Sequence, residues 1–247
     1  MKVRIKFAKQ GAMKFIGHLD VMRYFQKALR RADIDIAFSE GMSPHMIMSF
    51  AAPLGVGLTS DGEYVDIEIK TPITTAEALE KLNKVMADGM TILDFRQIEE
   101  GKASKAMSLV AAADYTVKFR KGCEPVGKKN PEDGPAGKMD WQSDISGFFA
   151  RKSIVITKQT KKGESEVDIR PMIYQMSVNA GVVSMQLATG SVANLKPELV
   201  MEAYAKFKGF ELPEFALEVN RREVYADLGQ NGKRRLVSLN DLGTILA

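Results

Sequence analysis

The spacing of hydrophobic residues in the first hundred positions changes several times, and each change predicts a new element. Val3, Ile5 and Phe7 alternate with cationic residues, which is typical of a strand with one buried face. From about residue 19 to residue 32 the apolar positions recur every three or four residues, which predicts an amphipathic helix. This half also contains four further strand patterns, at residues 34–38, 47–51, 64–70 and 90–98. A second helical pattern lies at residues 74–88. The predicted order is β-α-β-(β)-β-α-β.

That order is typical of a ferredoxin-like split βαβ unit with an extra hairpin. The second half repeats the theme more loosely, and its predicted elements lie at residues 108–120, 141–150, 153–158, 164–169, 174–178, 182–187, 197–207 and 215–225. We therefore predict an α+β fold of two tandem ferredoxin-like halves with mainly antiparallel sheets. The halves are expected at residues 1–104 and 105–247. Residues 121–140, rich in Gly, Pro and Lys, predict a mobile loop.

The composition excludes several classes of protein. No apolar run approaches the roughly 18 residues of a membrane span, and the alternating N-terminus does not resemble a signal peptide. The single cysteine, Cys123, excludes an internal disulfide and a self-contained iron–sulfur cluster. Phosphate-binding and dinucleotide-binding glycine motifs are absent, so no cofactor is expected. These features favour a cytoplasmic protein with no membrane partner.

A net charge of +4 is mild, so any case for nucleic-acid binding depends on where the cations lie. In the first predicted helix, Arg23, Lys27, Arg30 and Arg31 recur at three- and four-residue steps and share the face opposite the apolar stripe, together with Asp20. One interpretation is a solvated face whose terminal charges complement the helix dipole. The other is a surface on which arginine and lysine side chains bind the phosphates of an anionic ligand.

The chain has two histidines, and each has a structural and a chemical interpretation. His18 and Asp20 point about 200° apart on a regular helix, so they converge only if His18 precedes the helix and Asp20 caps it. His45 follows Pro44 in a turn that returns toward the helix. A capping and packing role competes with acid–base catalysis by His18, His45 and Asp20. Two histidines without cysteine ligands do not support a metal site.

The turn from Ser39 to His45 offers two serine hydroxyls, those of Ser39 and Ser43, beside Gly41 and Pro44. Gly41 can adopt positive φ and Pro44 restricts the chain, so the turn is expected to be rigid. Such a turn either binds an anion or presents His45 to a ligand, or it serves only as a rigid hairpin connection. The sequence leaves both open.

The motifs of residues 15–57 resemble those of an uncharacterised bacterial family linked to radical SAM enzymes. The matching positions are His18-Leu19-Asp20, Arg23, Arg30-Arg31, Ser39, Gly41, Pro44-His45 and Pro53-Leu54-Gly55. Asp168-Ile169-Arg170-Pro171 and residues 190–197 also resemble family motifs. The chain departs from the pattern at Met42-Ser43, where the family has Phe-Asn, at Met46, where it has a second proline, and at Gly17, where it has a serine.

The resemblance implies a standalone accessory or substrate-recognition protein that acts with a radical SAM enzyme. The iron–sulfur cluster of such a pair must then lie on the partner, because this chain lacks the thiolates. Combined with the cationic helix, the resemblance favours a protein that binds RNA or another anionic substrate. The alternatives are a standalone RNA-cleaving or RNA-modifying enzyme using His18 and His45, and a pure protein–protein adaptor. Whether the chain is an enzyme is left open.

Overall fold

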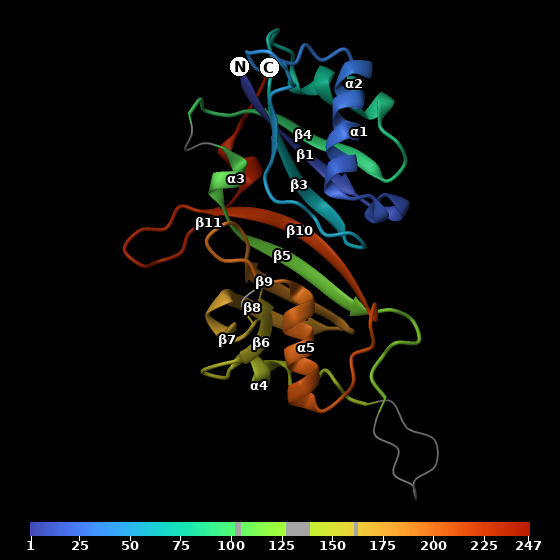
Figure 1. Ribbon diagram of the computed structural model, residues 1–247, viewed down its shortest axis with the longest axis vertical. Helices are drawn as coiled ribbons and strands as arrows, with labels where there is room; N and C mark the ends of the chain where they lie inside the picture. Colours follow the sequence, from blue (N-terminus) through green and yellow to red (C-terminus); the bar gives the residue numbers. More distant parts are fainter. Residues whose placement is uncertain (102–104, 127–138, 161–162) are drawn as a thin grey trace, which may run out of the picture. The chain divides into compact units, whose positions relative to one another are not determined.

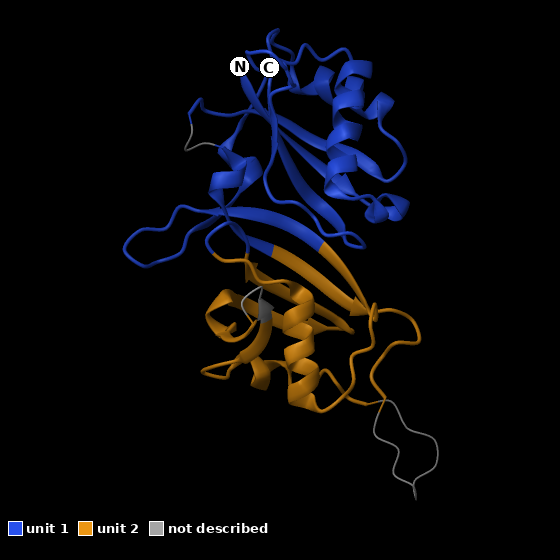
Figure 2. Ribbon diagram, viewed as in Figure 1, with its two compact units in different colours: residues 1–113, 189–192, 221–247 blue, residues 114–188, 193–220 orange. Residues whose placement is uncertain are grey.

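The computed structural model describes residues 1–101, 105–126, 139–160 and 163–247 (Figure 1). Within these residues the chain has a mixed α/β fold with twelve strands, mainly antiparallel, and five α-helices. Two compact units are present (Figure 2): the first comprises residues 1–113, 189–192 and 221–247, and the second comprises residues 114–188 and 193–220. Strands β5 (Val110–Phe119) and β10 (Leu217–Asp227) contribute residues to both units.

The first unit is an antiparallel sheet with two long helices. Its remaining elements are β1 (Lys2–Lys9), η1 (Gly11–Phe15), α1 (His18–Arg31), β2 (Met48–Phe50), β3 (Thr59–Glu68), α2 (Thr75–Val85), β4 (Met90–Gln97), α3 (Ala106–Leu109), β11 (Leu236–Ser238), η3 (Leu239–Leu242) and β12 (Thr244–Ile245). β1 pairs with both β3 and β4, and β2 pairs with β3, all antiparallel, which gives the order β4-β1-β3-β2. Helix α1 connects β1 to β2, and α2 connects β3 to β4.

The core of the first unit lies between one face of this sheet and the helices α1 and α2. The alternating residues Val3, Ile5 and Phe7 are at most 2% exposed. They belong to the same buried cluster as Phe25 of α1 and Leu82 of α2. Each such side chain contributes about 1.5–3 kcal/mol through burial, so the alternation in β1 determines which face of the sheet receives the helices.

The opposite face of the first unit's sheet is polar, yet part of it is also buried. Arg4 is 1% exposed and forms a bidentate ion pair with Asp66, with its Nε 2.7 Å from Oδ1. Arg4 also donates to the carbonyl of Leu239 in η3, and the backbone amide of Ala106 donates to Asp66. The short elements α3 and η3 therefore cover a charged pair whose hydrogen-bonding groups are satisfied, as burial of charge requires.

The second unit contains its own sheet, a separate hairpin and one long helix. Its elements besides β5 and β10 are α4 (Ile145–Phe149), β6 (Val155–Thr160), β7 (Gly163–Asp168), η2 (Arg170–Met172), β8 (Ile173–Asn179), β9 (Val182–Ala188) and α5 (Pro197–Lys208). The strand order is β10-β5-β9-β8, and β6 and β7 form a separate two-stranded sheet. Trp141, Phe148 and Tyr204 are buried, and the hydroxyl of Tyr204 donates to the carbonyl of Trp141. Burial, together with the nearby carboxylates of Asp144 and Asp140, raises the pKa of Tyr204 to about 12.

Most predicted elements lie close to observed ones, and the clearest difference is at residues 34–38. This segment forms only isolated bridges, Ile36 with Ile69 and Phe38 with Met46, and Ile69 lies just beyond the end of β3. The predicted mobile loop at 121–140 lies for the most part outside the described residues, which omit 127–138. The predicted domains 1–104 and 105–247 remain a prediction. The two compact units interleave along the chain, so they do not correspond to these ranges one to one. None of the helices described is long and apolar enough to cross a membrane.

Candidate functional site

Helix α1 exposes the cationic face that the sequence predicts. Arg23, Lys27, Arg30 and Arg31 are all exposed, whereas the helix buries Val21, Phe25, Ala28 and Leu29 on its other side. Arg23 pairs weakly with the exposed carboxylate of Asp20 at 3.5 Å. No acidic side chain among the described residues forms an ion pair with Lys27, Arg30 or Arg31. The face defined by Arg23, Lys27, Arg30 and Arg31, called the α1 cationic face below, therefore carries uncompensated positive charge.

His18 is the first residue of α1 and packs against the hydrophobic core. Its ring lies edge-on to Phe50 of β2, with the ring centroids 5.2 Å apart and the planes at 86°. Phe50 in turn contacts Phe7 and Phe25 in the same edge-on manner. Gly17 precedes His18 as the N-cap and has no side chain that could cap the helix. The backbone amides of Asp20 and Val21 both donate to the Gly17 carbonyl. The half-buried His18 ring thus extends an aromatic cluster.

His45 is exposed and is held by Ser39 across the turn. The Ser39 hydroxyl lies 2.8 Å from His45 Nδ1 and accepts from the His45 amide at 3.1 Å. The Ser39 amide donates to the His45 carbonyl at 2.8 Å, and Gly41 has φ of +109°, which only glycine adopts readily. Ser43 is exposed at the tip. The turn is therefore closed by three hydrogen bonds between Ser39 and His45.

The structure does not link the three residues predicted for acid–base chemistry. In the described part of the chain, no hydrogen bond or ion pair joins His18, His45 and Asp20 to one another. Asp20 pairs with Arg23, His18 packs on Phe50, and His45 bonds to Ser39. Among the described residues, no group of three or more His, Cys, Asp or Glu side chains could hold a metal ion.

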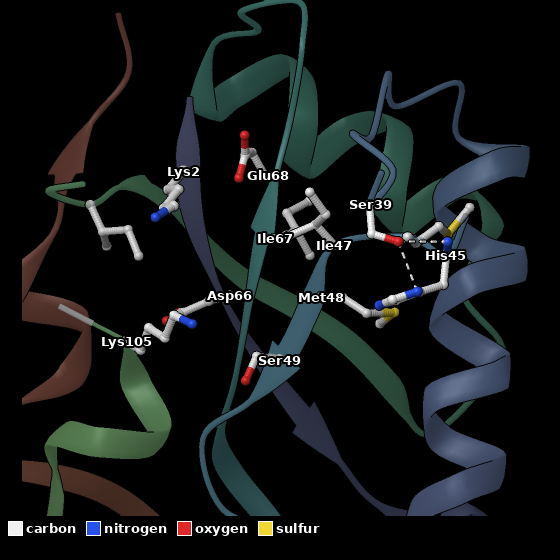
Figure 3. Close-up of a pocket in the computed structure, with 12 residues that line it drawn as sticks. Lys2, Ser39, His45, Ile47, Met48, Ser49, Asp66, Ile67, Glu68 and Lys105 are labelled. Atoms are coloured by element: carbon white, nitrogen blue, oxygen red, sulfur yellow. Dashed lines mark hydrogen bonds between the residues drawn. The ribbon is translucent and has the colours of Figure 1, made fainter. Parts of the chain in front are cut away.

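The Ser39–His45 turn borders a pocket of about 330 Å³ in the first unit. Figure 3 shows Ser39 and His45 at one edge of this pocket, joined by their hydrogen bonds, with charged side chains from β1 and β3 farther along it. The lining residues are Lys2, Ser39, His45, Met46, Ile47, Met48, Ser49, Asp66, Ile67, Glu68, Ile98 and Lys105. Two of the predicted site residues, Ser39 and His45, therefore lie at a pocket, and the residues of the α1 cationic face do not line it.

A buried polar cluster that the sequence analysis did not identify supports the motif-bearing loops. Glu63 and Arg221, 5% and 3% exposed, form an ion pair, and Arg221 also donates to the carbonyl of Ala52 at 2.7 Å. Lys9, 2% exposed, donates to the carbonyl of Ile16 at 2.9 Å. Burial lowers the pKa of Lys9, and the charge of Arg221 adds to this effect while Glu63 opposes it. The cluster fixes the backbone just before His18 and just after Phe50.

The sequence contained a signal for Lys9, because that residue occupies a position in the alternating pattern of β1 where a buried side chain is expected. Glu63 likewise shares the alternation of Val65 and Ile67 in β3. Charged residues at such positions indicate buried ion pairs. Arg221, the partner of Glu63, is 158 residues away from it in the chain, so that pairing was not predictable from spacing.

The second-half motif Asp168-Ile169-Arg170-Pro171 has a structural explanation. The carboxylate of Asp168 accepts from the amides of Ile154 and Arg170, and these bonds lower its pKa. The guanidinium of Arg170 lies 4.2 Å from the centre of the Phe149 ring and donates to the carbonyls of Arg151 and Ile173. These contacts join α4, the β6–β7 hairpin and β8 within the second unit.

Comparison with known proteins places this chain in a family. No curated protein matches it. A family model described as an uncharacterized protein conserved in bacteria matches residues 2–197, which include all of the predicted site residues. Because that match covers well over half of the chain, the protein belongs to this bacterial family of uncharacterized proteins (DUF2344).

Proposed function

We propose that this protein is a binding protein that holds RNA, or a similar polyanion, on the α1 cationic face. The observation that carries the proposal is the exposure of Lys27, Arg30 and Arg31 on one face with no acidic partner among the described residues. Side chains that already point into solvent at regular steps can contact successive phosphates without breaking existing ion pairs. Arginine adds bidentate hydrogen bonds to phosphate.

We also infer that the scaffold consists of two ferredoxin-like halves. In the first unit the order β4-β1-β3-β2, with a helix between β1 and β2 and another between β3 and β4, supports this inference. In the second unit the order β10-β5-β9-β8, with α4 between β5 and β8 and α5 between β9 and β10, supports it in the same way. The β6–β7 hairpin is then an insertion.

The cellular role that we propose is that of an accessory protein for a radical SAM enzyme in the cytoplasm, with catalysis on the partner. This part of the proposal rests on the motif resemblance. Co-purification of the tagged protein with a radical SAM enzyme from its own host tests it. Recovery of RNA alone, with no such enzyme, would contradict the partnership while leaving the binding function in place.

RNA binding is tested with the double variant Arg30→Ala/Arg31→Ala. We expect RNA affinity measured at low salt to fall by at least about tenfold, and the dependence of affinity on salt to weaken by about one unit of slope per lost phosphate contact. The matched control is Lys152→Ala/Lys158→Ala, which removes the same charge from exposed positions of the second unit. Unchanged affinity in the first variant, or an equal loss in the control, would contradict binding by the α1 cationic face.

A further inference from the structure

The pocket beside the Ser39–His45 turn combines an apolar wall with opposite charges that are not paired with each other. Its apolar lining includes Ile47 and Ile98. Ser49, labelled with Ile47 in Figure 3, adds a hydroxyl. A volume of about 330 Å³ lies at the lower end of the range for small-molecule sites. The pocket therefore suits a ligand with a short apolar body and a polar end.

The polar end of the pocket is lined by three charged side chains, those of Lys2, Glu68 and Lys105, besides that of Asp66. Lys2 and Glu68 are direct partners across β1 and β3, so their side chains project from the same face of the sheet at neighbouring positions. Both line the pocket, and no ion pair joins them in the described part of the chain. Lys105, exposed at the start of α3, adds a second ammonium group to the lining. One carboxylate and two ammonium groups thus remain available to a ligand.

Asp66, the fourth charged residue of the lining, is already engaged. Its two carboxylate oxygens accept from the guanidinium of Arg4 and from the amide of Ala106. Because its charge is neutralised by Arg4, it offers little attraction to a ligand cation. It instead fixes α3, and with it Lys105, against the sheet. The available charge of the pocket is therefore that of Lys2, Lys105 and Glu68.

We propose that this pocket binds a free α-amino acid with an apolar side chain. The ligand carboxylate lies by Lys2 and Lys105, its ammonium group lies by Glu68, and its side chain contacts Ile47 and Ile98. An α-amino acid carries its ammonium and carboxylate groups on one carbon, which matches the side-by-side placement of Lys2 and Glu68. This site is separate from the α1 cationic face, whose residues do not line the pocket.

The test is calorimetric titration of the full chain with three probes: L-leucine, L-leucinamide and 4-methylpentanoate. The two analogues lack the carboxylate charge and the amino group respectively. We expect saturable binding of L-leucine and a loss of affinity of at least about tenfold for each analogue, since each lacks one of the two charge-assisted contacts. Absence of L-leucine binding at millimolar concentrations would overturn the proposal and leave Lys2 and Glu68 as an ordinary cross-strand pair.

Two variants test which side chain binds each end of the ligand. Glu68→Gln should reduce L-leucine affinity to that of 4-methylpentanoate while leaving 4-methylpentanoate binding unchanged. Lys2→Met should weaken L-leucine binding while leaving L-leucinamide binding unchanged, and Lys105 retains part of the attraction for the carboxylate. Lys27→Met on α1 is the matched control and should change neither. Glu68→Gln preserves shape, and an unchanged circular dichroism melting temperature checks that it folds. Equal L-leucine affinity in wild type and Glu68→Gln would overturn the assignment, whatever the RNA measurements give.

Discussion

At the scale of single residues, the most consequential contact in the first unit is the buried ion pair of Glu63 and Arg221. Both residues are under 6% exposed, so neither charge has water to replace a lost partner. We predict that Glu63→Gln lowers the free energy of unfolding by about 3–5 kcal/mol, because it leaves the Arg221 guanidinium buried without a counter-charge. Urea unfolding followed by circular dichroism measures this.

Two further variants distinguish the cost of leaving a buried charge unpaired from the cost of losing an ion-pair contact. Glu77→Gln breaks the exposed pair with Lys81 on α2 and should cost only about 0.3–0.5 kcal/mol. The double variant Glu63→Leu/Arg221→Met should be more stable than the sum of the single losses, since it removes both buried charges together. A cost for Glu63→Gln no greater than that for Glu77→Gln would show that the pair is hydrated in solution.

At the scale of elements, the start of α2 depends on one side chain. The hydroxyl of Thr74 accepts from the amide of Glu77 at 3.2 Å and so satisfies one of the amides that the first turn leaves unpaired. We predict that Thr74→Ala costs about 1 kcal/mol of unfolding free energy, whereas Thr74→Ser, which keeps the hydroxyl, costs a few tenths. Chemical denaturation of both variants tests this, and equal losses would assign the effect to the methyl group instead.

The two long helices of the first unit begin in different ways, and the difference bears on the candidate site. Helix α2 has a threonine cap, whereas α1 begins after Gly17 with no capping side chain. His18 is consequently placed by its contact with Phe50, not by a cap. The backbone before it is held by Lys9, and the backbone after Phe50 by Arg221. The motif segment is thus positioned by elements outside it.

At the scale of the whole molecule, the last 27 residues belong to the first unit although they follow the second in sequence. Arg221 pairs with Glu63, Glu223 accepts from Tyr64 and Lys6, and the carbonyl of Leu239 accepts from Arg4. We predict that removing residues 221–247 unfolds the first unit, because Glu63, Tyr64 and Lys6, which are buried or half-buried, lose the partners named above. Loss of dispersed amide signals from residues 1–101 in NMR spectra measures this.

The same experiment tests the domain boundary predicted from sequence. If residues 1–104 form an independent domain, the truncated chain should keep the spectrum of its N-terminal half. A matched truncation at residue 243 removes only β12 and the end of the chain, and should leave that spectrum largely intact. Retention of the N-terminal signals in both truncations would contradict the dependence on β10 and η3.

The sequence alone predicted most of the longer elements of this protein and the face that α1 buries, because both follow from local periodicity. The alternation of Val3, Ile5 and Phe7 and the helical stripe through Phe25 are visible in the chain and are buried in the structure. The exposure of Arg23, Lys27, Arg30 and Arg31 follows from the same rule, since they occupy the opposite side of that stripe.

Only the tertiary structure decided what lies next to what. The pairing of Glu63 with Arg221, the packing of His18 on Phe50 and the pocket shared by Lys2, His45 and Glu68 join residues that are distant in sequence. Residues 34–38 have the composition of a strand but form isolated bridges only. Whether such a segment becomes a strand depends on the neighbouring segments with which its backbone can pair. Such contacts depend on how the strands are ordered in a sheet. The spacing of hydrophobic residues along the chain does not determine that order.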